Sequence, residues 1–210
     1  MMKKTSLIYK LLILIVTGIS LYINLKYLTF RKGIAYFTIQ SNLFCFIFYL
    51  VSFILFIFKK LKKGDTYYLL KGMATMAITL TMVIYYFVIA THGITGYEGH
   101  NIECIFAHLI VPGLIMLDYV IFGEKGHLKK NYPFIWSLFL LIYTAFSNLY
   151  VMLGGTYING KEFAYFFMDS SKYGTSGVMI NSLILYVSFV VFGIIVYYLD
   201  NKASKQRKIV

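Results

Sequence analysis

Long apolar runs alternate with short polar connections along this chain. Each run is about 20 residues long, the length that a helix needs to cross a bilayer. Backbone groups in hydrocarbon must bond within their own segment, so the runs predict helices. The pattern is unlike the short alternating segments of a β-barrel. We therefore predict an all-α six-helix membrane bundle, forming one domain over residues 1–210, with spans at residues 7–28, 35–58, 67–90, 102–122, 134–153 and 178–199.

Polar side chains inside the predicted spans are costly, so their positions carry information. In the second span, Thr38, Ser41 and Asn42 have the i, i+3, i+4 spacing of one helical face. In the fourth span, His108 and Pro112 follow Cys104 at intervals of four. Two polar stripes are therefore expected on two different helices.

Composition supports a membrane location. The chain is 60% hydrophobic and only 13% charged, against about 25% charged in a typical soluble domain. The net charge is +12, and most Lys and Arg residues flank the connections on the side of the two termini. The positive-inside rule then predicts cytoplasmic N- and C-termini and a multi-pass protein of the cell membrane. We expect anionic lipid headgroups, and no nucleic acid, at the basic clusters formed by Lys59, Lys60, Lys62 and Lys63 and by Lys202, Lys205, Arg207 and Lys208.

With this orientation, several helices bring polar groups to one layer in the outer leaflet. Thr38 and His108 lie at depths that agree within about 5 Å, at ~1.5 Å rise per residue. The same layer receives Ser147 and Asn148, then Asn181 and Ser182, and finally Thr91 and His92. Ser, Thr and Asn also join transmembrane helices by hydrogen bonds, so a purely structural role remains the alternative.

Other ionisable groups receive simpler interpretations. Asp118 and Lys71 lie at similar depth near the cytoplasmic side, which predicts a structural ion pair, with a proton relay as the alternative. The histidines and Glu103 lack a firm ligand spacing, so we expect neither a metal nor a cofactor. Cys45 and Cys104 lie at different depths, and no disulfide is expected between them.

Two segments carry a resemblance to a known family. At residues 36–43 (YFTIQSNL) and 108–112 (HLIVP), with Asp118, the chain resembles the bacterial predicted six-span membrane proteins. These are similar to the animal androgen-induced membrane hydrolases, which cleave fatty-acid esters of hydroxy fatty acids. The resemblance covers most of the chain in span number and order. It implies a nucleophile at Thr38, a partner at His108 and a third motif in the aromatic segment 163–169, which contains Tyr165.

The hypothesis that follows is an integral membrane lipid-ester hydrolase or acyl-transfer enzyme. A Thr hydroxyl needs a base within reach, and a neutral imidazole can serve. The expected substrate is a membrane lipid or fatty-acid ester. Asn42 shares a face with Thr38 and is the better donor to an oxyanion than Gln40. A transporter, channel or lipid-binding protein is the alternative, followed by a structural or sensory component, and the oligomeric state stays open. The expected substrate-binding residues are Ser41, Asn42, Asn148, Asn181 and Tyr165.

Overall fold

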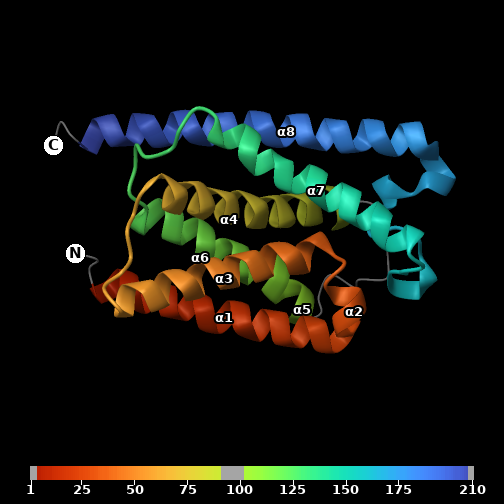
Figure 1. Ribbon diagram of the computed structural model, residues 1–210, viewed down its shortest axis with the longest axis horizontal. Coiled ribbons are helices and arrows are strands. Elements are labelled where there is room, and N and C mark those ends of the chain that lie inside the picture. The colour runs from red at the N-terminus through yellow and green to blue at the C-terminus, as the bar shows by residue number, and fades with distance from the viewer. Residues whose placement is uncertain (1–3, 91–101, 208–210) are drawn as a thin grey trace.

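The computed structural model describes residues 4–90 and 102–207, and within them the chain is helical without a β-strand. Six helices are long and apolar enough to cross a membrane. The prediction of an all-α six-helix membrane bundle is therefore confirmed. Figure 1 shows the helices side by side, with both ends of the chain at the same end of the bundle. The long helices are α1 (Lys4–Leu28), α3 (Phe37–Ile57), α4 (Asp65–Ile84), α7 (Tyr132–Met152), α8 (Ser170–Arg207) and a composite helix that begins with α5 (Ile102–Ile105) and continues through α6 (Val111–Leu117).

Three π-helical turns interrupt or extend these helices. One extends α4 over Tyr85–Ile89, and the others flank α6 at Phe106–Ile110 and Asp118–Phe122. Single π-turns inside α-helices are rare and occur often at functional sites. Their positions next to α6 are used below.

The observed helix ends differ from the predicted spans where the chain leaves the bilayer. Helix α1 begins at Lys4 and α8 continues to Arg207, because polar residues prolong a helix beyond the apolar run that hydropathy detects. The segment that starts α8 is bent at Gly174, whose φ of 66° is readily adopted by glycine. A short helix, α2 (Phe30–Gly33), and 3₁₀ turns at Ile158–Gly160 and Phe166–Met168 complete the described connections.

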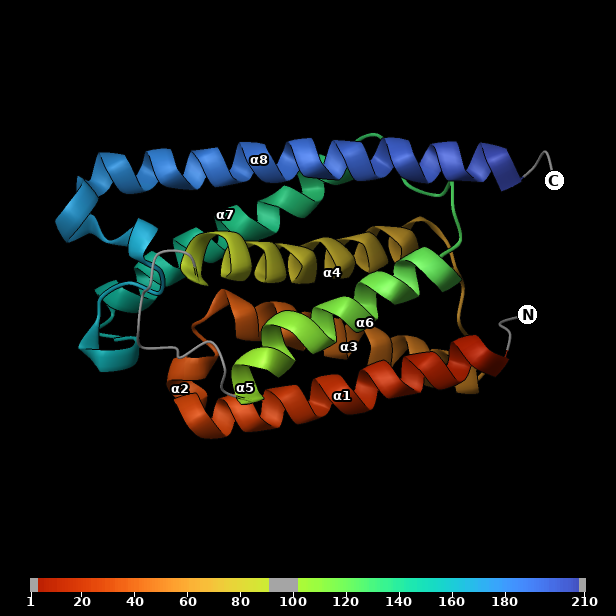
Figure 2. The same ribbon diagram turned by 180° about the vertical axis from the view of Figure 1, so that it is seen from behind.

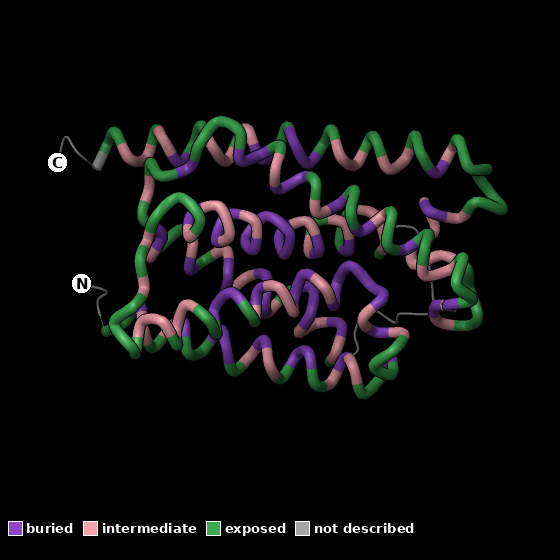
Figure 3. Tube along the Cα trace, viewed as in Figure 1, coloured by how far each residue is buried: buried purple, intermediate pink, exposed green. Residues whose placement is uncertain are grey.

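Helix α1 shows which kinds of side chain lie on the surface of the bundle and which lie in its interior. Its apolar residues Ile8 and Ile15 are exposed, whereas Lys10, Thr17 and Asn24 are buried. A bilayer explains this arrangement, since apolar side chains face acyl chains and polar side chains face the protein interior. Figure 3 shows buried segments gathered where α1, α3, α4 and α6 meet, while much of α8 is exposed.

The helices form a tight group with two helices added on one side. Helices α1, α3, α4 and α6 pack together, α7 packs on α4, and α8 packs chiefly on α7 (Figures 1 and 2). A buried apolar layer in the middle of the group contains Ile13, Cys45, Ile78, Val111 and Ile115. Both cysteines are buried free thiols.

A buried ion-pair cluster lies beyond this layer, toward the two termini. Lys71 Nζ lies 2.9 Å from Asp118 Oδ2, which confirms the predicted pair. The sequence did not predict that Lys10 also binds this carboxylate, with Nζ 2.5 Å from Oδ1. The Tyr49 hydroxyl donates a third hydrogen bond, at 3.0 Å. Asp118 is fully buried, so one carboxylate serves two nearly buried ammonium groups.

Candidate functional site

Thr38 and His108 meet at the end of the bundle opposite the termini. Thr38 lies in the first turn of α3, and His108 lies in the π-turn Phe106–Ile110. Thr38 Oγ1 is 3.2 Å from His108 Nε2, within hydrogen-bond distance. Both residues are buried, with 9% and 5% exposure. Two residues 70 positions apart therefore form a hydroxyl–imidazole contact inside the protein.

The second ring nitrogen of His108 determines which atom donates in this contact. His108 Nδ1 is 3.0 Å from the backbone oxygen of Cys104, and a carbonyl oxygen can only accept. In the neutral ring, the proton therefore sits on Nδ1, and Nε2 presents its lone pair to Thr38. The Thr38 hydroxyl donates to that lone pair. This is the arrangement that a general base needs in front of a nucleophile.

Pro112 and Tyr85 explain the placement of the imidazole. Proline has no N–H to donate and its ring clashes with the carbonyl four residues earlier, which here belongs to His108. The π-turn ends directly before this proline region and relieves the clash. On the other side, the Tyr85 ring stacks on His108 at 4.0 Å with an interplanar angle of 26°. Tyr85 itself begins the π-turn that extends α4.

Hydrogen bonds fix the backbone of the turn that leads into α3 and of the first turn of that helix. Tyr36 is extended and precedes the first residue of α3, and Gln40 Nε2 donates to the Ile34 oxygen at 3.0 Å. Ser41 Oγ donates to the Thr38 oxygen at 3.0 Å and lies 2.7 Å from Thr81 Oγ1 on α4. These bonds anchor the first turn of α3, so the Thr38 side chain has a defined position.

Asn42 also supports the site, through hydrogen bonds to the backbone of α3 and of the π-turn. Its Nδ2 donates to the Thr38 oxygen at 2.8 Å and to the Ala107 oxygen at 3.4 Å. Asn42 thus ties α3 to the π-turn that carries His108. Because its N–H groups are occupied by backbone oxygens, Asn42 is a positioning residue in this structure, and neither Asn42 nor Ser41 lines the cavities beside Thr38.

Tyr165 comes from the long connection between α7 and α8. Its hydroxyl lies 3.5 Å from Thr38 Oγ1, and its ring stacks on Phe167. The same connection is held down by Tyr157, which is fully buried and lies 2.7 Å from Ser147 Oγ, hydroxyl to hydroxyl. The Ile158 N–H donates to the Tyr36 hydroxyl at 3.1 Å. The connection therefore covers the end of the bundle opposite the termini.

Two cavities flank the Thr38–His108 contact, and both are lined by Thr38, His108 and Tyr165. The outer cavity has a volume of about 100 Å³ and extends under the long connection to Lys161. The inner cavity has a volume of about 40 Å³ and is mainly apolar. Its lining includes Leu80, Ile84, Leu140, Tyr143 and Leu185.

Two of the predicted polar residues lie elsewhere. Asn148 is exposed on α7, one position after the inward face that carries Tyr143 and Ser147 at i and i+4. Asn181 donates to the Phe167 oxygen at 2.9 Å and so holds the connection to α8. Neither Asn148 nor Asn181 lines the cavities beside Thr38, whereas Ser182 does. Thr91 and His92 lie outside the described residues.

The sequence interpretation missed two tyrosines at the site. Tyr85 stacks on His108, and Tyr143 is a buried residue that lines the inner cavity. The i, i+4 spacing of Tyr143 and Ser147 places both on one face of α7, and this pattern could have identified Tyr143 as an inward-facing residue. Tyrosines are so common in this chain, with 20 in all, that no pattern separated these two.

The described residues contain no cluster of three or more His, Cys, Asp or Glu side chains that could hold a metal ion.

No family model, curated protein or solved structure matches this chain. Its six apolar helices indicate a multi-pass membrane protein.

Proposed function

We propose that the protein is an integral membrane enzyme that hydrolyses a lipid ester, or transfers its acyl group, with Thr38 as nucleophile and His108 as general base. The observation that carries the proposal is the 3.2 Å contact between Thr38 Oγ1 and His108 Nε2. A Thr–His pair needs this order of donor and acceptor.

The reaction follows from the two atoms in contact. Thr38 Oγ1 attacks the ester carbonyl carbon while His108 Nε2 takes the hydroxyl proton. When the tetrahedral intermediate collapses, the C–O bond to the alcohol breaks and His108 returns the proton to the leaving oxygen. An acyl-Thr38 ester remains. Water attacks this ester with His108 again as base, releasing the fatty acid and restoring the hydroxyl; an alcohol in place of water would complete an acyl transfer.

The surroundings favour the charges that develop in this reaction. The Cys104 carbonyl at 3.0 Å orients the ring and stabilises the imidazolium, in place of the carboxylate of other triads. The Tyr85 ring supplies a cation–π contact to the same cation. The Tyr165 and Tyr143 hydroxyls line the cavity beside Thr38 and are candidate donors to an oxyanion, and the first turn of α3 adds the positive end of a helix dipole.

The two cavities suit a substrate with one apolar and one polar end. The inner cavity offers aliphatic side chains to an acyl chain, and the outer cavity brings Lys161 toward an anionic group on the alcohol part. A fatty-acid ester of a hydroxy fatty acid has both features, in agreement with the resemblance described above.

The fold also favours this proposal over transport. A transporter or channel would need a polar path from His108 to Asp118, which are separated by about 15 Å along one helix. Val111 and Ile115 lie between them on that helix and are fully buried, together with Ile78 from α4. The protein interior between the two polar sites is therefore closed by apolar side chains.

Activity-based labelling and ester hydrolysis test the proposal together. Purified protein in micelles should react with a fluorophosphonate probe and hydrolyse a long-chain fatty-acid ester. Thr38→Ala should abolish labelling and lower kcat by about 10³-fold or more. His108→Gln should lower kcat by about 10²- to 10⁴-fold. Thr38→Ser should keep both signals.

The matched control is Thr17→Ala, which removes a buried threonine hydroxyl from α1, away from both cavities. It should leave labelling and kcat unchanged. Labelling that persists in a folded Thr38→Ala variant would reject Thr38 as the nucleophile.

A further inference from the structure

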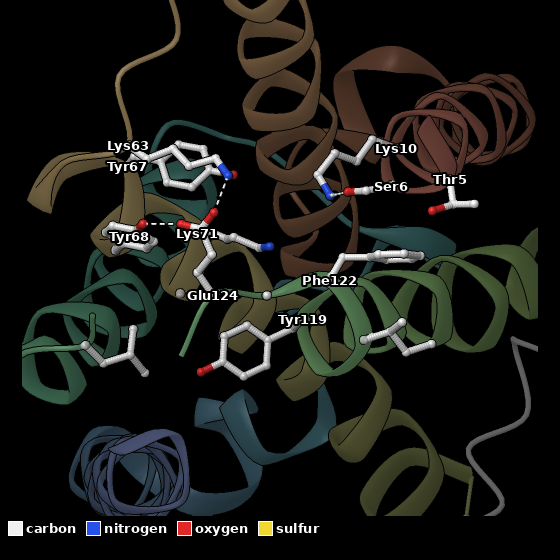
Figure 4. A pocket seen from close by; sticks show the side chains of 14 residues that line it. Thr5, Ser6, Lys10, Lys63, Tyr67, Tyr68, Lys71, Tyr119, Phe122 and Glu124 are labelled. Carbon is white, nitrogen blue, oxygen red and sulfur yellow. Dashed lines mark hydrogen bonds and ion pairs between the residues drawn. The ribbon is translucent and has the colours of Figure 1, made fainter. Parts of the chain in front are cut away.

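A second cavity lies at the other end of the bundle, beside the buried ion-pair cluster. Its volume is about 460 Å³, within the range of small-molecule sites and larger than the cavities beside Thr38. Figure 4 shows the side chains that line it, which come from the start of α1, from the start of α4 and from the turn that follows α6. This cavity takes no part in the proposed ester chemistry.

The charges around this cavity do not balance. Lys10, Lys63 and Lys71 line it. Lys10 and Lys71 share the single carboxylate of Asp118, and Lys63 binds Glu124 with Nζ 2.6 Å from Oε1. Three ammonium groups therefore face two carboxylates. The unmatched positive charge belongs to a nearly buried pair, since Lys10 and Lys71 are only 8% and 6% exposed.

An excess buried charge at a cavity needs either water or an anion to solvate it. Hydroxyl donors surround the same space, including those of Thr5, Ser6 and Tyr67. A group with one negative charge and several acceptor oxygens fits this set of donors, and a phosphate diester has both properties.

An apolar cleft lies next to this cavity on the side of α7 and α8. The cleft has a volume of about 370 Å³ and shares Gly72, Tyr119 and Leu128 with the charged cavity. Its walls come from α4, α6, α7 and α8, and they include Met116, Val120, Trp136, Phe192 and Val196.

The rim of the cleft is open to the membrane. Val120 and Leu199 at its edge are both 61% exposed. Helix α8 packs chiefly on α7 and meets the turn after α6 through the 2.7 Å hydrogen bond from the Tyr119 hydroxyl to Asp200. An acyl chain in the bilayer can enter here.

We infer that the charged cavity and the cleft together bind an anionic glycerophospholipid, with its phosphate at Lys10, Lys63 and Lys71 and an acyl chain in the cleft. The phosphate and the chain are covalently joined in such a lipid, and the cavity and the cleft lie on either side of the same residues, Gly72, Tyr119 and Leu128. A free phosphate would use only the charged cavity. The predicted cytoplasmic orientation of this end also matches the leaflet in which anionic lipids are concentrated.

Lipid retention by the purified full-length protein tests the inference. Native mass spectrometry in micelles would compare dioleoyl phosphatidylglycerol with dioleoyl phosphatidylcholine, with sn-glycerol 3-phosphate as a soluble competitor. We expect preferential retention of phosphatidylglycerol and no displacement by an equal concentration of glycerol phosphate. Lys63→Gln and Lys71→Met should each weaken retention about tenfold or more, the effect of losing one charge-assisted hydrogen bond.

Lys130→Gln is the matched control, because it removes an exposed charge outside the cavity and outside both basic clusters, and it should leave retention unchanged. Lys63 lies in the connection before α4 and outside the Asp118 cluster, so its variant remains informative if Lys71→Met does not fold. Equal retention of the two lipids, or unchanged retention in Lys63→Gln, would overturn the inference. Displacement by glycerol phosphate at equal concentration would overturn the assignment to a lipid.

Discussion

The Asp118 cluster allows a quantitative test of how charge is balanced inside this bundle. Asp118 is fully buried and accepts from Lys10, Lys71 and Tyr49 at 2.5, 2.9 and 3.0 Å. Asp118→Asn keeps the shape of the side chain but leaves two buried ammonium groups without a counter-charge. Removing one partner of a buried ion pair typically costs about 3–5 kcal/mol.

The expected effect is a large loss of thermal stability. For a chain of this length, each kcal/mol shifts Tm by about 2–4 °C, so Asp118→Asn should lower Tm by about 6–20 °C. Thermal unfolding in a neutral detergent, without added anionic lipid, can be followed by the fluorescence of Trp136, the only tryptophan.

Lys71→Met provides the contrast that tests the reasoning. It removes one of two cations and leaves Lys10 and Asp118 as a neutral pair, so Tm should fall far less than in Asp118→Asn. In the double variant, Asp118→Asn with Lys71→Met, one buried cation remains and part of the lost Tm should return. If Asp118→Asn and Lys71→Met lowered Tm equally, the idea of one carboxylate balancing two cations would be refuted.

Two further predictions concern packing and orientation. A methyl group at Gly72 would lie 2.8 Å from Trp136 Cε2, so Gly72→Ala should cost about 1–3 kcal/mol and shift the tryptophan emission, whereas Gly113→Ala meets open space and should be neutral or stabilising. Unchanged emission and Tm in Gly72→Ala would contradict the packing of α4 on α7. The predicted orientation requires that Lys62→Cys react with an impermeant maleimide only in permeabilised cells and that Asn159→Cys react in intact cells; the native cysteines are buried. The reverse pattern of labelling would invert the orientation.

The helices could be predicted because hydropathy measures the property that a bilayer selects. The apolar runs were long enough to predict every span, and the predicted spans overlap the long helices throughout. The bend at Gly174 and the three π-turns were not predicted, because they depend on local backbone geometry and on packing. Pro112 was noted in the sequence only as part of a polar stripe.

At the site, depth within the bilayer was the successful predictor. Thr38 and His108 were paired because they lie at the same height, and Lys71 was paired with Asp118 for the same reason. Lys10 was not paired with Asp118, because a lysine near a helix end ordinarily extends to the interface.

The asparagines were harder to assign. Periodicity places a side chain on a face of a helix, but a backbone oxygen on the next helix can occupy its donors. Asn42 bonds to the Thr38 oxygen of its own helix and to the Ala107 oxygen of the neighbouring π-turn, and Asn181 bonds to the Phe167 oxygen in the aromatic connection. The stacked Tyr85 ring could not be inferred either, because aromatic contacts depend on distances between helices.

The buried Tyr157 has a consequence for how substrate would be chosen. This side chain is fully buried in the connection that lies over the end of the bundle opposite the termini, with its hydroxyl against Ser147. A connection held in place over Thr38 favours esters that approach from the bilayer over esters dissolved in water. Turnover should accordingly follow the mole fraction of an ester in the membrane, and its partition coefficient would rank substrates before any recognition at Thr38.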